Sequence, residues 1–136
     1  CYTCSTYKPD LLIDIATLTG FAEIMSCAHS GYYFTENEKI KKDVEELSFR
    51  LGERMIPMIT WNDMGDILKS KVADISNITQ RDCNDAFMAA IFLKEFITCT
   101  KTDWLHIDLS HEFDDSIPEG NGIRTMIHLV HKYLLI

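Results

Sequence analysis

The stretch Asp10–Gly20 carries a nearly unbroken run of apolar residues, interrupted by Asp14. A short apolar run that follows the turn-forming pair Pro9-Asp10 predicts a strand that is covered on both faces. The run ends at Gly20, where the backbone can bend sharply or approach a ligand closely. A carboxylate inside such a strand is costly unless it is paired or hydrogen-bonded, so we expect Asp14 to have a partner.

Three later segments are also predicted to be extended: Gly31–Thr35, Met55–Thr60 and Trp104–Leu109. The first is aromatic and the third is apolar, and both compositions are typical of strands. Pro57 limits the middle segment to an extended connection or an edge strand, because proline cannot donate a backbone hydrogen bond.

Helical spacing appears between these extended segments. Apolar residues recur at helical intervals after Thr35, which forms a capping-box pattern with Glu38, and Gly52 supplies a C-terminal stop. The residues of this apolar stripe are Ile40, Val44, Leu47 and Leu51. Shorter helices are predicted over Phe21–Cys27 and Trp61–Lys71.

Two helices are predicted in the second half of the chain. The stretch Asp85–Thr98 is apolar on nearly every side and should be buried, with Asp82 or Asn84 as its N-terminal cap. The apolar stripe of the last helix comprises Ile123, Met126, Ile127, Val130 and Leu134. Strands therefore alternate with helices, which predicts an α/β fold with a mainly parallel or mixed sheet flanked by helices, in one domain over residues 1–136.

Composition narrows the range of partners. The chain has 136 residues, 46% of them hydrophobic, and a net charge of -8. That charge argues against a nucleic acid or an anionic membrane as the main partner, and charged residues interrupt every apolar run well short of the roughly 18 residues that a membrane helix needs.

The chain starts with cysteine, so we expect a fragment or a processed product. Five scattered cysteines indicate free thiols in a reducing compartment, such as the cytoplasm.

The densest group of chemically active side chains lies at the end of the strand predicted over Trp104–Leu109. His106 and Asp108 alternate onto one face, and His111 and Glu112 could reach the same space from the following loop. Such nitrogen and oxygen ligands would suit zinc, manganese or iron. Alternatively, His106 and Asp108 are hydrogen-bonded supports of the sheet.

Two smaller patterns could belong to metal sites, or they could be ordinary buried cysteines and surface histidines. Cys1 and Cys4 form a C-x-x-C pair without a second pair at metal spacing. His128 and His131 are spaced i, i+3 beside a lysine, which is more typical of a helix surface than of a metal site.

Five segments, in this order, resemble the leucyl (cytosol) aminopeptidase family. Asp14–Gly20 reads D-I-A-T-L-T-G and is similar to the family's D-[IV]-A-T-L-T-G segment. The other four are Leu68–Ile78, Ala89–Phe96, Trp104–Asp108 and Gly120–Arg124, which resemble L-x-S-x-x-A-D-x-x-N-I, A-A-A-F-L-x-x-F, W-x-H-[LI]-D and G-x-G-[VI]-R. Several matches with compatible spacing are specific, and they cover almost the whole chain.

The resemblance implies part of the catalytic domain of a metal-dependent aminopeptidase. In the family, two divalent ions, zinc or manganese, activate the water that removes the N-terminal residue of a peptide substrate. The family's ligands are a lysine and carboxylates on segments that precede the A-T-L-T-G strand, ending in an N-T-D-A-E-G-R motif, and none of these occurs in the 136 residues. We therefore assign no catalytic residue and no metal ligand to this chain, and we expect it to be inactive by itself.

The resemblance does assign a wall of the substrate pocket. Thr17, Leu18 and Gly20 match family residues that border the substrate's first side chain and the reacting peptide group. Ser110 and His111 stand where the family has a small Ala-Gly pair, and a further predicted lining residue is Phe113. These larger and more polar groups are expected to shrink or block the pocket.

Two hypotheses follow. The chain is either the C-terminal portion of a working aminopeptidase, or a catalytically dead family member that serves as a structural or assembly protein. The second is favoured by the replacement at Ser110 and His111 and by the loss of family glycines before the buried helix. The resemblance also implies self-association, because family members form hexamers.

Overall fold

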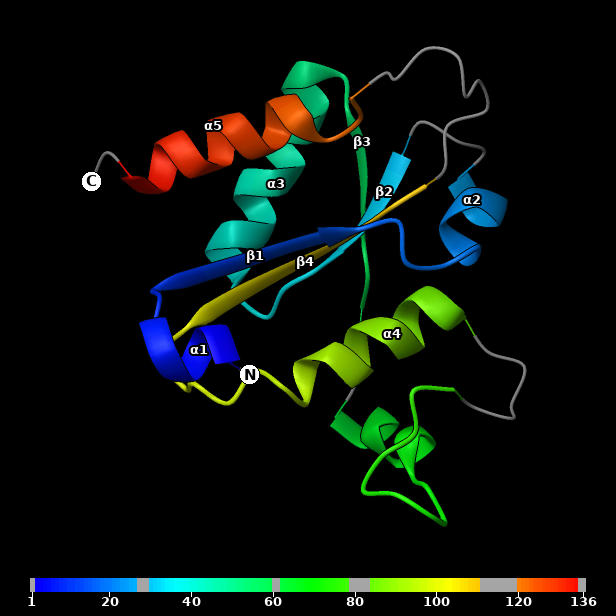
Figure 1. Ribbon diagram of the computed structural model, residues 1–136. Helices are drawn as coiled ribbons and strands as arrows, with labels where there is room; N and C mark the ends of the chain where they lie inside the picture. Colours follow the sequence, from blue (N-terminus) through cyan, green and yellow to red (C-terminus); the bar gives the residue numbers. More distant parts are fainter. Residues whose placement is uncertain (1, 27–29, 60–61, 79–83, 111–119, 135–136) are drawn as a thin grey trace.

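A computed structural model gives the fold, and it describes residues 2–26, 30–59, 62–78, 84–110 and 120–134. The strands are β1 (Leu11–Ala16), β2 (Ser30–Phe34), β3 (Arg54–Pro57) and β4 (Asp103–Leu109). The helices are α1 (Tyr2–Tyr7), α2 (Phe21–Ser26), α3 (Glu38–Leu51), α4 (Asp85–Lys94) and α5 (Ile123–Leu134), with the 3-10 helix η1 at Asn62–Leu68. The predicted alternation of strands and helices is confirmed (Figure 1).

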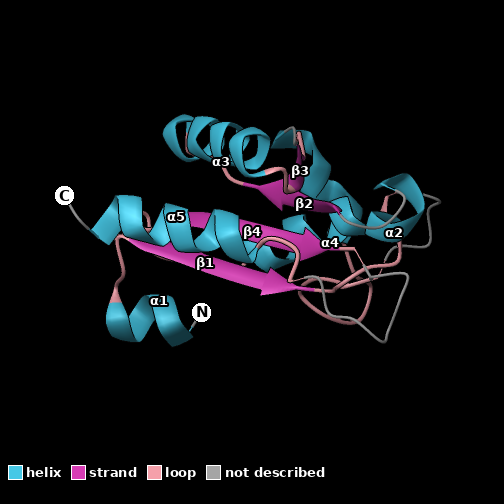
Figure 2. Ribbon diagram, turned by 90° about the horizontal axis from the view of Figure 1, so that it is seen from above, coloured by secondary structure: helices cyan, strands magenta, loops and turns pink. Residues whose placement is uncertain are grey.

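The four strands form one mixed sheet in the order β1-β4-β2-β3. β1 runs parallel to β4, and β2 runs parallel to β3, whereas β2 and β4 are antiparallel. The α/β fold is therefore confirmed. Figure 2 shows β1 and β4 side by side, with α5 lying along them.

Helices cover both faces of the sheet. Figure 1 shows α3 and α5 on one face of the sheet. They pack there on the odd-numbered side chains of β4 through Val44, Leu105, Ile107 and Leu129, which are all fully buried. On the other face, Ala90 of α4 packs against a cluster that includes the even-numbered side chain of Trp104. Side chains alternate between the faces of a strand, so β4 contributes to both layers.

The boundaries of α3 show how local chemistry sets a helix. The side-chain oxygen of Asn37 accepts hydrogen bonds from the backbone N–H groups of Lys39 and Ile40, which satisfies the first turn. The predicted cap at Thr35 is wrong, because the Thr35 hydroxyl instead accepts from the N–H of Asn37. The predicted stop at Gly52 is confirmed: this residue has a φ of 71° in the left-handed region.

The burial predicted for β1 is wrong within the described chain. Its residues are only partly buried, and Ile15 is 47% exposed. β4 is the single neighbour of β1 among the described strands. An apolar run identifies a strand, but its burial depends on how many strands and helices flank it.

The apolar stripe of α5 is not the side that is buried among the described residues. The buried residues of this helix are Thr125 and Leu129, whereas four of the five residues in the predicted stripe are exposed: Ile123, Ile127, Val130 and Leu134. Hydrogen bonds at both ends of α5 set the rotation of the helix about its own axis. Glu53 binds the first turn of the helix, and Asp43 binds Lys132 and Tyr133 in its last turn.

Candidate functional site

The candidate site lies at the carboxyl ends of β1 and β4. These strands are parallel, and Ala16 at the end of β1 pairs with Asp108. The segment Thr17–Gly20 and Ser110 therefore emerge at the same edge of the sheet, although they are about ninety positions apart in the sequence. The carboxyl ends of strands are where open α/β sheets place their ligand sites.

Asp108 holds the segment that follows β1. Its side chain is fully buried, and Oδ1 accepts hydrogen bonds from the backbone N–H groups of Leu18 (2.8 Å) and Thr19 (3.3 Å). Its other oxygen, Oδ2, accepts from the hydroxyl of Thr19 at 2.6 Å. The three donors compensate the cost of burying a carboxylate and fix the path of the chain from Leu18 to Thr19.

The three residues assigned to the substrate wall in this segment face open space. Thr17 is exposed, and Leu18 is 46% exposed although it is apolar. A side chain added at Gly20 would meet no atom of the described residues within 4 Å. The backbone carbonyl of Gly20 accepts from the N–H of Ile24, which starts α2. The segment is thus fixed at both ends, and the role of these residues as a wall stays a prediction.

Ser110 is buried at the same edge. Its hydroxyl donates to the carbonyl of Ser30 at 2.5 Å and accepts from the N–H of Ser30 at 3.1 Å. The side chain thereby joins the end of β4 to the start of β2. His111 and Phe113, the other two residues assigned to the pocket wall, lie outside the described residues.

A second polar group lies on the same face of the sheet, two residues before Ala16 on β1 and two residues before Asp108 on β4. Asp14 accepts a hydrogen bond from the indole Nε1 of Trp104 at 2.5 Å and is 2.6 Å from Nδ1 of His106. The rings of Trp104 and His106 are stacked, with centroids 5.8 Å apart. The expectation that Asp14 has a partner is confirmed. Nε2 of His106 has no hydrogen-bond partner among the described residues.

This geometry supports the interpretation of His106 and Asp108 as hydrogen-bonded supports. The carboxylate of Asp108 is turned toward the segment after β1, and His106 is turned toward Asp14. In the part of the chain that the structure describes, no three or more His, Cys, Asp or Glu side chains are grouped so that they could hold a metal ion. The proposed ligands His111 and Glu112 lie outside that part. The described residues alone do not fit the pair of divalent ions that the family resemblance implies.

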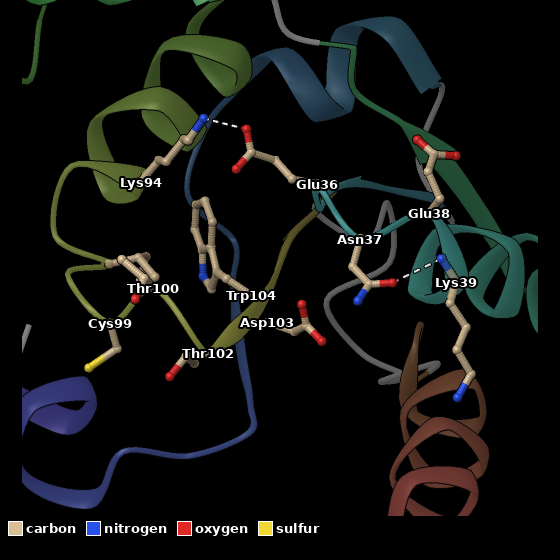
Figure 3. Close-up of a pocket in the computed structure, with 11 residues that line it drawn as sticks. Glu36, Asn37, Glu38, Lys39, Lys94, Cys99, Thr100, Thr102, Asp103 and Trp104 are labelled. Atoms are coloured by element: carbon tan, nitrogen blue, oxygen red, sulfur yellow. Dashed lines mark hydrogen bonds and ion pairs between the residues drawn. The ribbon is translucent and has the colours of Figure 1, made fainter.

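A cavity of about 590 Å³ lies at the opposite end of the sheet, where β2 ends and β4 begins (Figure 3). Asp103 and Trp104 lie on one side of this cavity, and the start of α3 lies on another. Lys94 forms an ion pair with Glu36 at 2.5 Å across its rim. Among the described residues, none of those predicted to bind substrate lines this cavity, and its charges of both signs are partly paired with each other.

The G-x-G-I-R segment has a structural role in the described residues. Glu53 is buried at the start of α5 and accepts hydrogen bonds from the N–H groups of Arg124 (3.1 Å) and Thr125 (2.7 Å) and from Nε of Arg124 (3.1 Å). Burial raises the pKa of the Glu53 carboxyl, but these hydrogen bonds outweigh burial and hold the pKa below its usual value. Gly122, with a φ of 82°, lets the chain turn into the helix.

Sequence patterns missed the contact between Asp108 and Thr19. Both residues stand in recognised segments, but no pattern along the chain pairs positions 89 residues apart. The available signal was chemical: a carboxylate near the end of a buried strand needs donors, and the segment after the neighbouring parallel strand supplies them.

The fold and this edge define an α/β domain whose candidate site is formed by the segments that follow two parallel strands. Residues 1–127 match the model of the cytosol aminopeptidase family, catalytic domain. The chain belongs to this family, and the resemblance inferred from the five segments is confirmed.

Curated relatives agree with this assignment. A probable cytosol aminopeptidase of Chlorobium phaeobacteroides is 33% identical over 140 residues, which cover 97% of this chain and 27% of the relative. A probable cytosol aminopeptidase of Chlamydia felis is 31% identical over 144 residues, covering 98% of this chain and 28% of the relative. The chain thus spans about a quarter of the length of these relatives.

Solved structures show the same fold. A mutant of tomato leucine aminopeptidase superposes with a TM-score of 0.84 at 29% identity, covering 96% of this chain and 26% of the other. The bottromycin maturation enzyme BotP gives a TM-score of 0.82 at 29% identity, with 96% and 30% of the two chains covered. The chain is therefore a fragment of a cytosol aminopeptidase-family catalytic domain.

Proposed function

We propose that this chain supplies the substrate-bordering part of a metal-dependent aminopeptidase, whose metal ligands lie on other segments of the complete protein. The reaction is removal of the N-terminal residue from a peptide. The observation that carries the proposal is the segment Thr17–Gly20, which Asp108 fixes at the carboxyl edge of the sheet while Leu18 remains open to a ligand. By itself the chain is expected to bind no dinuclear metal centre and to be inactive.

The arrangement of Ser110 favours this proposal over a catalytically dead structural protein. A polar residue at this position was expected to intrude on the pocket. Instead its hydroxyl is used by both hydrogen-bonding groups of Ser30, and the residue is only 4% exposed. The substitution is thus accommodated within the sheet.

The test uses the complete protein that contains this chain. We expect it to hydrolyse a leucyl amide substrate after addition of manganese or zinc and to lose that activity when the metal is chelated. The separate 136-residue chain should show no turnover with either metal. If the complete protein is inactive with both metals while an active family member turns over under the same conditions, the structural role replaces the enzymatic one.

We infer in addition that the complete protein self-associates, as hexameric family members do, in a reducing compartment such as the cytoplasm. Its partners would be copies of itself and peptide substrates, without nucleic acid or membrane. Cys4 and Cys99 are free thiols, which is compatible with a reducing environment. No helix among the described residues has both the length and the apolar character needed to cross a membrane. Sedimentation analysis of the complete protein tests the self-association.

A further inference from the structure

Asp108 and Thr19 join the two segments that meet at the candidate site. We propose that Asp108 is a positioning residue for substrate binding, and that the Thr19 hydroxyl is the contact through which it sets the segment Thr17–Gly20. This inference rests on the proposed function, because it takes this segment to border the bound substrate. Asp108 itself is fully buried and touches no substrate in this proposal.

The geometry of the contact fixes the segment more firmly than a single hydrogen bond would. One carboxylate oxygen receives two successive backbone N–H groups, from Leu18 and Thr19, and the other receives the Thr19 hydroxyl. Two donors from neighbouring residues restrict the peptide unit between them, and the hydroxyl fixes the Thr19 side chain. Hydrogen bonds to an ionised carboxylate are roughly twice as strong as bonds between neutral groups.

Because Asp108 is fully buried, its carboxylate depends on the hydrogen-bond donors that this contact supplies. A fully buried carboxylate has no water to replace a lost donor, so removing the Thr19 hydroxyl leaves Oδ2 without that partner. The segment must then shift if Oδ2 is to recover a donor. Such a shift moves Leu18 and Gly20, two of the three residues that face open space at this edge.

Thr19→Val tests the proposal, because valine keeps the shape of threonine and removes only the hydroxyl. Thr19→Ser restores the hydroxyl and serves as the conservative rescue. A matched control is Thr102→Val: the Thr102 hydroxyl donates to the carbonyl of Pro9 at 2.7 Å and so joins the other ends of the same two strands. All three variants are made in the complete protein, with leucyl amide hydrolysis and amide hydrogen exchange as readouts.

We expect Thr19→Val to speed hydrogen exchange of the Leu18 and Thr19 amides about ten-fold or more. The same variant should raise KM by about ten-fold and change kcat by less than about three-fold, because the segment affects substrate binding. Thr19→Ser should return both quantities to within about three-fold of the parent values. Thr102→Val should leave both at the parent values, even where it lowers the unfolding midpoint.

Three results would overturn the proposal. The first is that the Leu18 and Thr19 amides exchange in Thr19→Val at the same rate as in the parent. The second is that these amides exchange faster in an active Thr19→Val enzyme whose KM is unchanged. The third is that Thr102→Val raises KM as far as Thr19→Val does. If the unmutated protein has no activity, the proposed function fails and the substrate role of Asp108 fails with it. The exchange measurement still shows in that case whether Asp108 and Thr19 fix the segment.

Discussion

The two faces of β4 are equally buried but are built from different chemistry. On the face toward α3 and α5, Leu105 and Ile107 are fully buried among other apolar side chains. On the opposite face, His106 and Asp108 are also fully buried, yet each has a specific polar partner from β1 or the segment that follows it. The apolar face stabilises the fold through its buried contact area. The polar face determines where its partners on β1 and on the segment after β1 lie.

This difference predicts different responses to substitution. Apolar packing is nondirectional, so a shortened side chain costs stability in proportion to the volume lost. A buried hydrogen bond is directional, and losing one partner leaves the other unsatisfied. The apolar face should therefore control stability, whereas the polar face should control local geometry at the candidate site.

The largest loss of stability is expected for Ile107→Ala. Ile107 is fully buried beneath α3 and α5, so the change removes apolar contact and leaves a cavity. We expect the free energy of unfolding to fall by about 2–5 kcal/mol. Urea denaturation of the complete protein measures this change.

A matched control is Ile78→Ala, which makes the same substitution at a residue that is 73% exposed. Its effect should stay within about 0.5 kcal/mol. Equal losses in the two variants would contradict the assignment of Ile107 to the core.

On the polar face, Asp14→Ala is expected to have the next largest effect. The substitution removes the acceptor for the indole N–H of Trp104 and the partner of His106, both of which are buried. We expect a loss of about 1–3 kcal/mol, because water can reach this partly exposed position and replace some of the lost bonding. A change in near-ultraviolet circular dichroism should accompany the loss, since Trp104 is held by this bond. A spectrum and a stability that match the parent would show that the pair contributes little.

Glu53 adds a polar anchor to the apolar side of the molecule. Hydrogen bonds at the start of α5 hold the pKa of its carboxyl below the usual value, despite the opposing effect of burial. The stability that this carboxylate contributes is therefore present above the ordinary glutamate pKa of about 4.3 and is lost as the pH falls through the lower folded value. Glu53→Gln should cost about 1–2 kcal/mol at pH 7.

The pH dependence separates this anchor from simple packing. Below pH ~4 the difference in stability between Glu53→Gln and the parent should shrink, because the parent loses its charge as well. Urea denaturation at pH 7 and at successively lower pH gives both values. A difference that stays constant with pH would mean that the charge of Glu53 is not the stabilising feature.

Local patterns in the sequence predicted most of the elements but not their surroundings. The strand around Asp14, the helix that stops at Gly52 and the final helix were all predicted from spacing and turn residues. Which side of α5 is buried was not predictable in that way, because Glu53 and Asp43 set the rotation from distant positions. Periodicity shows that a helix has an apolar side, but distant polar contacts can override it.

At the candidate site, the sequence indicated the segment and the structure supplied the contact. The resemblance placed Thr17, Leu18 and Gly20 beside a substrate, and their position at the carboxyl edge agrees with the usual location of sites in α/β sheets. The bonds between Asp108 and Thr19 depend on the parallel pairing of β1 with β4, which the spacing along the chain does not specify.

The smallest effect is expected at the rim of the cavity far from the candidate site. Lys94 and Glu36 form an ion pair at 2.5 Å, but their side chains are 38% and 63% exposed, so water and salt screen the attraction. Lys94→Gln should therefore lower the free energy of unfolding by less than about 0.5 kcal/mol. Lys132→Gln is the matched comparison, because Lys132 pairs at 2.7 Å with Asp43, whose side chain is only 10% exposed. The loss in Lys132→Gln should be the larger of the two in urea denaturation, since burial of Asp43 reduces the screening. The opposite order would show that burial of the carboxylate does not decide the strength of these pairs.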